Sequence, residues 1–157
     1  MELQDKNISL KNNKVHHVLA YSYFSFFLLF LVGVFLDIFF PIKIFQGSSI
    51  KFFGLIFLFL ASILVLWAQM TSRNLNKENL TIDTFCRGPY CFTRSPTHWG
   101  LFLLTLGFGF VANAGFVVLC TIISFFITKF IFLKREEDIL ARKYGAPYLE
   151  YKKKIKF

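Results

Sequence analysis

Three long apolar segments constrain this chain more than any other feature of its sequence. They cover residues 18–40, 50–70 and 98–133, and the first two each supply the roughly 20 apolar residues that a bilayer crossing needs. Among the 157 residues, 55% are hydrophobic and 23 are phenylalanine. A soluble domain of this size cannot bury so many large apolar side chains. We therefore expect an integral membrane protein that forms one domain over residues 1–157.

The third apolar segment is too long for a single span. The sequence ANAG at 112–115 divides it, since Asn and Gly favour tight turns. The prediction is a helical hairpin with spans at 98–111 and 116–133. The expected fold class is an all-α integral membrane protein with about four transmembrane helices. Its last two form the hairpin, a cytosolic loop covers 71–97, and a cytosolic C-terminal helical extension covers 134–157.

Gly100 and Gly107 lie seven residues apart in the third predicted span. Two helical turns separate them, so both face the same side. Because they lack side chains, we expect them to allow close packing against a neighbouring helix.

Lysine and arginine are distributed unevenly. The N-terminal arm, the loop 71–97 and the residues from Lys129 onward hold 16 of the 18. By the positive-inside rule these segments face the cytoplasm, with both termini. The Lys- and Phe-rich composition and short length indicate a bacterial inner membrane. We attribute the net charge of +9 to basic residues that orient the chain in the membrane and contact anionic lipid headgroups. Neither nucleic acid nor a protein partner is expected.

The three cysteines, Cys86, Cys91 and Cys120, give no disulfide framework. The first two have the spacing C-x4-C, which is a weak zinc pattern without a second pair, so no metal site is expected. We expect reduced thiols on the cytosolic side.

The loop before the hairpin, RGPYCFTRSPTHWG at 87–100, is dense in polar residues. Its Gly-Pro and Ser-Pro pairs stiffen it, because each proline restricts the preceding residue to extended conformations. Arg94 offers a planar donor fork suited to a carboxylate. His98 lies near the start of the next helix, where backbone N–H groups favour an anion. The alternative is that Arg94 binds lipid phosphate and Trp99 anchors the interface.

Two adjacent glutamates follow the last span. At helical spacing Glu136 has only apolar neighbours, and Glu137 is intermediate. A carboxylate on an apolar stripe is costly unless something satisfies it. Glu136 is therefore a candidate ligand-facing residue, the alternative being that it emerges into the headgroup layer.

The helix that carries these glutamates is expected to end at Gly145, and Pro147 prevents its continuation. The following YLEYKKK is aromatic and basic. Tyr148 and Tyr151 could anchor this tail in the membrane interface.

In their order, these motifs resemble the isoprenylcysteine carboxyl methyltransferase and phospholipid methyltransferase superfamily of membrane enzymes. The pattern is Gly-Pro-Tyr, Arg-x-Pro, a glycine four residues later, an apolar hairpin, Glu-Glu and Gly-x-x-Tyr-x-x-Tyr. The matching residues lie in the second half of the chain: Gly88, Pro89, Tyr90, Arg94, Pro96, Gly100, Glu136, Glu137, Gly145, Tyr148 and Tyr151.

The resemblance implies an isoprenylcysteine carboxyl methyltransferase-like enzyme that uses S-adenosylmethionine. The cofactor would bind at the cytosolic face, and a lipid-like or membrane-partitioned acceptor would arrive from the lipid. Arg94 and its neighbours would hold the cofactor's amino-acid end, a glutamate would accept its ribose or amino hydrogen bonds, and tyrosines would wall the pocket. The implied cofactor-binding residues are Gly88, Pro89, Tyr90, Arg94, Ser95, Pro96, His98, Gly100, Glu136, Glu137, Tyr148 and Tyr151, and the candidate catalytic residues are Arg94, Glu136 and His98.

The chain departs from that pattern at two positions. Ser95 stands where the family usually has histidine, and His98 stands where it usually has tyrosine. The first change removes a cofactor contact, which His98 is a candidate to replace. The alternative function is a non-catalytic relative that binds cofactor or lipid at a degenerate site. An amine acceptor would need a base, with His98 or a glutamate as the candidates.

Overall fold

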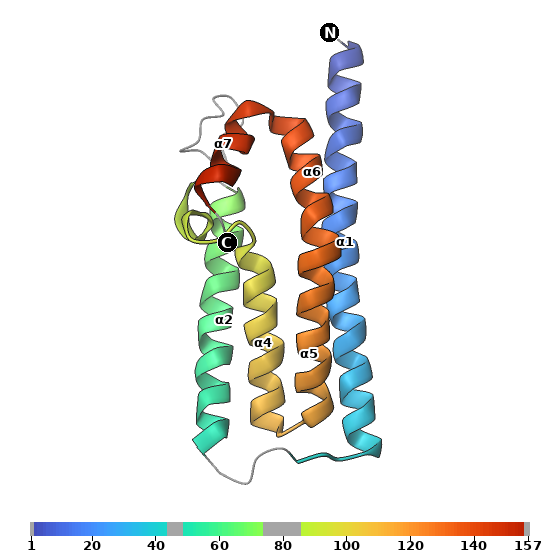
Figure 1. Cartoon of the computed structure of the whole chain (residues 1–157), viewed down its shortest axis with the longest axis vertical. Helices are drawn as coiled ribbons and strands as arrows, with labels where there is room; N and C mark the ends of the chain where they lie inside the picture. The colour runs from blue at the N-terminus through green and yellow to red at the C-terminus, as the bar shows by residue number, and fades with distance from the viewer. Residues whose placement is uncertain (1, 44–48, 74–85, 156–157) are drawn as a thin grey trace.

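The longest helices of the chain run side by side. The computed structural model describes residues 2–43, 49–73 and 86–155. Its main helices are α1 (Glu2–Phe39), α2 (Ser49–Arg73), α4 (Pro96–Ala112) and α5 (Gly115–Ile127), which lie in the order α2, α4, α5, α1 across Figure 1. Every regular element in these ranges is helical, which confirms the all-α prediction. The polar N-terminal arm continues the first apolar helix without a break.

Several of these helices suit a bilayer. By length and composition, three segments could cross a membrane: Ala20–Phe39, Ser49–Ser72 and Gly115–Arg142. The fourth apolar helix, α4, has 17 residues. Large apolar side chains point outward along the bundle, and Phe24 and Phe59 are 62% and 68% exposed. Lipid would solvate them. The chain is a multi-pass membrane protein, while the number of crossings and their boundaries stay predictions.

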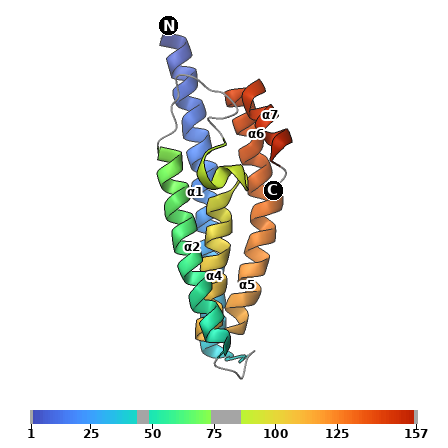
Figure 2. The same ribbon diagram turned by 90° about the vertical axis from the view of Figure 1, so that its left-hand side faces the viewer.

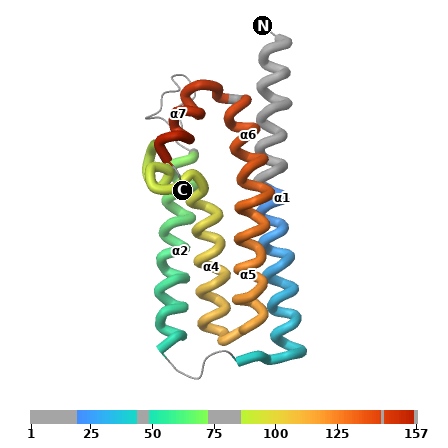
Figure 3. The backbone as a smooth tube through the Cα atoms, viewed as in Figure 1, coloured from blue at the N-terminus to red at the C-terminus, as the bar shows by residue number. Residues whose placement is uncertain are grey.

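The predicted hairpin joins α4 to α5 at one end of the bundle, as the trace in Figure 3 shows. Asn113 adopts the left-handed conformation at φ 52°, which asparagine tolerates better than most residues. At the start of α5, the Asp37 Oδ2 atom accepts a hydrogen bond of 2.9 Å from the Val117 backbone N–H. Asp37 therefore satisfies a helix N-terminus, a structural role.

At the other end, α5 passes through a π-turn, η2 (Thr128–Phe132), into the charged helix α6 (Leu133–Tyr144). Gly145, at φ 63°, closes α6. Pro147 then lies in the first turn of a further helix, α7 (Ala146–Lys154), where its missing N–H costs nothing. Figures 1 and 2 show α7 folding back over this end, beside the loop that leads into α4. The aromatic and basic tail is thus helical.

Glycines bring α2 and α4 into direct contact. A Cβ atom on Gly54 would lie 2.8 Å from the carbonyl oxygen of Gly107, and one on Gly107 would lie 2.9 Å from that of Gly54. A Cβ on Gly100 would clash with the Val65 side chain. The expectation that Gly100 and Gly107 allow close helix packing is confirmed.

Replacing Gly107 by Val should separate α2 from α4, because the added atoms would meet backbone as well as side chains. We expect a loss of about 1–3 kcal/mol, typical of overpacking. Ala112→Val, which creates the same side chain by adding two methyl groups at an exposed position of α4, should cost less than about 0.5 kcal/mol. Thermal unfolding in detergent can be followed by the dye reactivity of the buried Cys120 thiol. Equal midpoints for the two variants would contradict the packing argument.

Candidate functional site

The loop after α2 packs against that helix through its first turn, η1 (Gly88–Cys91). Gly88 has φ 55°, in the left-handed region that favours glycine, and a Cβ there would lie 2.6 Å from the Thr71 Oγ1 atom. A disulfide joins Cys86 to Cys91 across the turn. The expectation of reduced thiols is wrong for this pair, because the turn brings the two Cα atoms within 4.5 Å.

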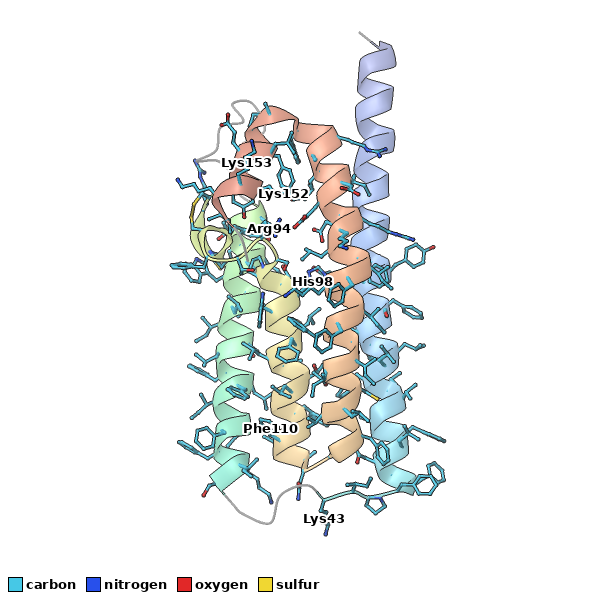
Figure 4. The ribbon with its side chains drawn as sticks, viewed as in Figure 1. Lys43, Arg94, His98, Phe110, Lys152 and Lys153 are labelled. Atoms are coloured by element: carbon cyan, nitrogen blue, oxygen red, sulfur yellow. A yellow bond between two sulfur atoms is a disulfide. The ribbon has the colours of Figure 1, made fainter. Side chains whose placement is uncertain are left out.

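Glu137 is the centre of the polar cluster at this end of the bundle. Its Oε1 atom lies 2.6 Å from Arg94 Nη1, and its Oε2 atom lies 2.8 Å from Lys152 Nζ. One carboxylate therefore connects the loop before α4, helix α6 and helix α7. Figure 4 shows Arg94 and Lys152 together at the α7 end, with His98 further toward the middle of the bundle. The Arg94 and Glu137 side chains are only 17% and 9% exposed, so solvent screens this pair weakly.

Glu136 has a different environment. It is half-buried and, within the described residues, its carboxylate makes no hydrogen bond or ion pair. Its charge instead acts on three phenols, those of Tyr23, Tyr90 and Tyr148. The sequence favoured Glu136 as the ligand-facing carboxylate, and that assignment stays a prediction. Glu137 is the more buried because its cationic partners come from distant parts of the chain.

Tyrosines fix α7 onto the loop. The Tyr151 hydroxyl donates a hydrogen bond of 2.7 Å to the Tyr90 carbonyl, and the Tyr148 and Tyr151 ring centroids lie 5.9 Å apart. Both α7 tyrosines are buried, so interfacial anchoring does not describe them. Burial raises the pKa of Tyr151 to about 12 and also raises the pKa of Tyr90 and Tyr148. All three phenols remain protonated donors at neutral pH.

His98 is held from α1, which the sequence did not indicate. Its Nε2 atom lies 3.0 Å from the Ser22 hydroxyl, and both residues are buried. The Tyr23 ring packs against the imidazole with centroids 5.8 Å apart. The available sequence signal was weak: Ser22 is a small polar residue within an apolar segment.

A cavity of about 70 Å³ lies beside this cluster, between α4 and the α5–η2 junction. Of the predicted site residues, Arg94, Ser95 and His98 line it, whereas Gly100 packs against α2. Sequence reasoning missed the opposite wall, which is formed by Phe125, Thr128, Lys129 and Leu133. Pockets for drug-sized ligands measure about 300–1,000 Å³. A whole nucleoside cofactor would therefore have to displace part of the wall.

Comparison with protein families identifies a match over residues 49–147, more than half of the chain, to the family described as phospholipid methyltransferase. The matched region takes in α2, the loop, the hairpin and α6, and it leaves α1 outside. Comparison with curated proteins and with solved structures finds no significant match.

Tyr151→Phe should remove the bond that joins α7 to the loop, at a cost of about 1 kcal/mol. The pKa of Tyr151 is about 12 in the folded protein, above the unfolded value of about 10. The contribution of the protonated Tyr151 hydroxyl to the free energy of unfolding is therefore complete below pH 10 and is lost as the pH rises toward 12. Unfolding midpoints measured across this range should fall more steeply for the wild type than for the variant. Parallel curves would contradict the assignment.

The two glutamates should respond differently to amide substitution. Glu137→Gln weakens both ion pairs and should cost about 1.5–3 kcal/mol, most of it from the better-buried Arg94 contact. Glu136→Gln breaks no ion pair and should change stability by less than about 0.5 kcal/mol. Thermal unfolding of both variants in one detergent tests this ranking, and a larger loss for Glu136→Gln would reverse it.

Proposed function

Because the chain belongs to the phospholipid methyltransferase family, we propose that it transfers a methyl group from S-adenosylmethionine to a lipid or membrane-partitioned acceptor. The observation that carries this proposal is the convergence of Arg94, Glu136 and Glu137 where the loop, α6 and α7 meet. S-adenosylmethionine bears a carboxylate, an amino group and a sulfonium. A site with side chains of both charges, walled by tyrosines, fits that combination.

Within this site, Arg94 is suited to the cofactor's carboxylate, since a guanidinium binds carboxylates through two parallel donors. Glu137, which already binds two cationic groups, is suited to the amino group. Glu136 has no cationic partner among the described residues, so its carboxylate is suited to a positively charged part of the ligand. Binding would require Arg94 and Glu137 to exchange part of their mutual contact for contacts with the ligand.

Bound S-adenosylmethionine would supply an electrophilic methyl group on a positively charged sulfur. The protein would position the acceptor in line with that methyl group and exclude water. A carboxylate or thiolate acceptor needs no base. An amine acceptor must lose a proton, and Glu136, which has no cationic partner among the described residues, is the better candidate base. His98 is the second, with Ser22 orienting its ring.

We place the site at the cytosolic face of a bacterial inner membrane, with both termini on that side. The starts of α1 and α4, the end of α2 and helix α7 gather at one end of the bundle. The Cys86–Cys91 disulfide lies in this region too, although disulfides are typical of oxidising compartments. The distribution of charge in the sequence supports this orientation, because the N-terminal arm, the loop 71–97 and the residues from Lys129 onward hold 16 of the 18 basic residues.

A non-catalytic relative that binds cofactor or lipid is the second candidate. The observation that favours it is the pair of substitutions beside Arg94. Ser95 lines the cavity with a side chain shorter than the histidine usual in the family, and His98 is engaged by Ser22. This candidate predicts ligand binding without turnover.

Calorimetry of S-adenosylmethionine with the detergent-purified full chain tests the proposal. We expect micromolar binding that Arg94→Ala and Glu136→Ala each weaken by at least about tenfold, because each removes a charged contact. Asp138→Ala, which removes an exposed carboxylate from the same helix, is the matched control and should bind normally. A folded wild-type protein that binds no S-adenosylmethionine would refute the function. Binding with no methyl transfer to extracted membrane lipids would select the second candidate.

A further inference from the structure

The Cys86–Cys91 disulfide has no part in the proposed cofactor site, yet it lies in the loop that carries Arg94. It joins a cysteine before the turn η1 to the last residue of that turn. Both cysteines are half-buried, so a thiol in solution can approach them, whereas the free thiol of Cys120 is buried in α5. Of the three cysteines in the chain, the loop pair is therefore the one open to thiol–disulfide exchange.

The backbone hydrogen bonds of the turn constrain it weakly. The Tyr90 N–H donates to the Arg87 carbonyl at 3.2 Å. The Phe92 and Thr93 N–H groups share the Pro89 carbonyl, at 3.1 Å and 3.2 Å. These lengths are at the upper end for N–H···O bonds, and short 3₁₀ segments have poorer hydrogen-bond geometry than α-helices. The covalent bond between the two cysteines therefore constrains the turn more firmly than its hydrogen bonds do.

The residues between the two cysteines favour opening of the turn once the disulfide is broken. Gly88 holds φ 55°, and glycine gains more conformational freedom than any other residue when it is released. Arg87, next to Cys86, is exposed. A neighbouring cation favours the thiolate form of a cysteine, which is both the leaving group on reduction and the nucleophile on reoxidation.

Two contacts connect the turn to the cofactor site. The Tyr90 carbonyl belongs to the turn and accepts the 2.7 Å bond from the Tyr151 hydroxyl of α7. Arg94 comes three residues after Cys91 and lies 2.6 Å from Glu137. If the turn opens, the acceptor that holds α7 and the guanidinium suited to the cofactor's carboxylate both lose their fixed positions.

We propose that Cys86 and Cys91 form a reversible redox switch, which fixes the site loop when oxidised and releases it when reduced. That the switch controls S-adenosylmethionine binding rests on the function proposed above. A loop at the cytosolic face, where that proposal places it, meets thiols of the glutathione class that reduce disulfides. The disulfide here and the reducing thiols there are then the two states of one loop.

Reduction proceeds by two exchanges. A reductant thiolate attacks one cysteine sulfur, the S–S bond breaks, and the other cysteine leaves as a thiolate and takes up a proton. A second reductant thiolate attacks the mixed disulfide and releases the first cysteine in the same way. Two electrons and two protons have passed to the cysteines, and the two reductant molecules have become a disulfide. The disulfide form of the same reductant drives the reverse exchange.

Hydrogen–deuterium exchange measures release of the loop without any ligand. The full chain in neutral detergent is compared in oxidised glutathione and in millimolar reduced glutathione. We expect the amides of Tyr90, Phe92 and Thr93 to exchange at least about tenfold faster in the reduced chain, because their hydrogen bonds open more often. The amides of α5 should exchange equally in both states. Equal exchange of the loop amides in the two states would overturn the proposal.

Calorimetry tests the connection to the cofactor. We expect the oxidised chain to bind S-adenosylmethionine at least about tenfold more tightly than the reduced chain, and reoxidation to restore the affinity. Cys86→Ser and Cys91→Ser should each show the weaker binding in either buffer. Cys120→Ser, which removes the buried thiol of α5, is the matched control and should keep the full response. A wild-type protein with equal affinities in both states would contradict the control of binding.

Thiol counting separates a switch from a permanent bond. After equilibration in glutathione buffers, maleimide labelling of the denatured chain should find one free thiol in the oxidised form and three in the reduced form. A count that stays at one in millimolar reduced glutathione, or at three in oxidised glutathione, would overturn the proposal. Loop exchange that depends on the redox buffer, with no S-adenosylmethionine binding in either state, would refute the proposed function alone.

Discussion

A carboxylate that is buried loses its hydration, and ion pairs or hydrogen bonds must offset that loss. At this end of the bundle the buried carboxylate is that of Glu137. Its two oxygens bind Arg94 from the loop and Lys152 from α7. The loop also contacts α2 at Gly88, and α7 follows α6 through Gly145, so Glu137 adds an ion-pair connection between segments that come from different parts of the chain. The bond from Tyr151 to the Tyr90 carbonyl joins the same two segments a second time. The geometry of the site therefore depends on the buried carboxylate of Glu137, which binds two cationic side chains.

The bundle beneath the cluster supports it through close helix contacts rather than a large core. Few of its side chains are fully buried, and most large apolar ones point outward. Glycine contacts bring α2 against α4, while the Ser22–His98 bond ties α1 to the start of α4. Because α1 lies outside the region matched by the family, this bond brings the site a residue that the family match does not include.

The sequence predicted those parts of the molecule that follow from local rules. Apolar length located the helices, the ANAG turn divided the hairpin, and glycine spacing indicated the packing face of α4. Contacts between distant segments could not be predicted in this way. Local spacing gives Glu137 a lysine neighbour that Glu136 lacks, but it does not indicate that Glu137 binds Arg94 and Lys152. The same limit explains why Ser22 was missed, since its bond to His98 depends on where α1 lies. The Cys86–Cys91 disulfide is local, and it was missed because the turn η1 that brings the two cysteines together was not predicted.

The π-turn between α5 and α6 has a consequence for how this protein can change over evolutionary time. Its backbone bond runs from the Leu133 N–H to the Thr128 carbonyl, five residues back, so it amounts to one inserted residue in a continuous helix. Each residue of an α-helix advances the side-chain direction by about 100°. The wider turn absorbs the extra residue, so a deletion at the π-turn would restore a regular helix and leave the directions of Glu136 and Glu137 unchanged. The same deletion in the middle of α5 would instead rotate every later side chain by about 100° relative to the start of that helix. The π-turn is thus the place between α5 and α6 where the chain can lose a residue without turning the charged helix away from Arg94.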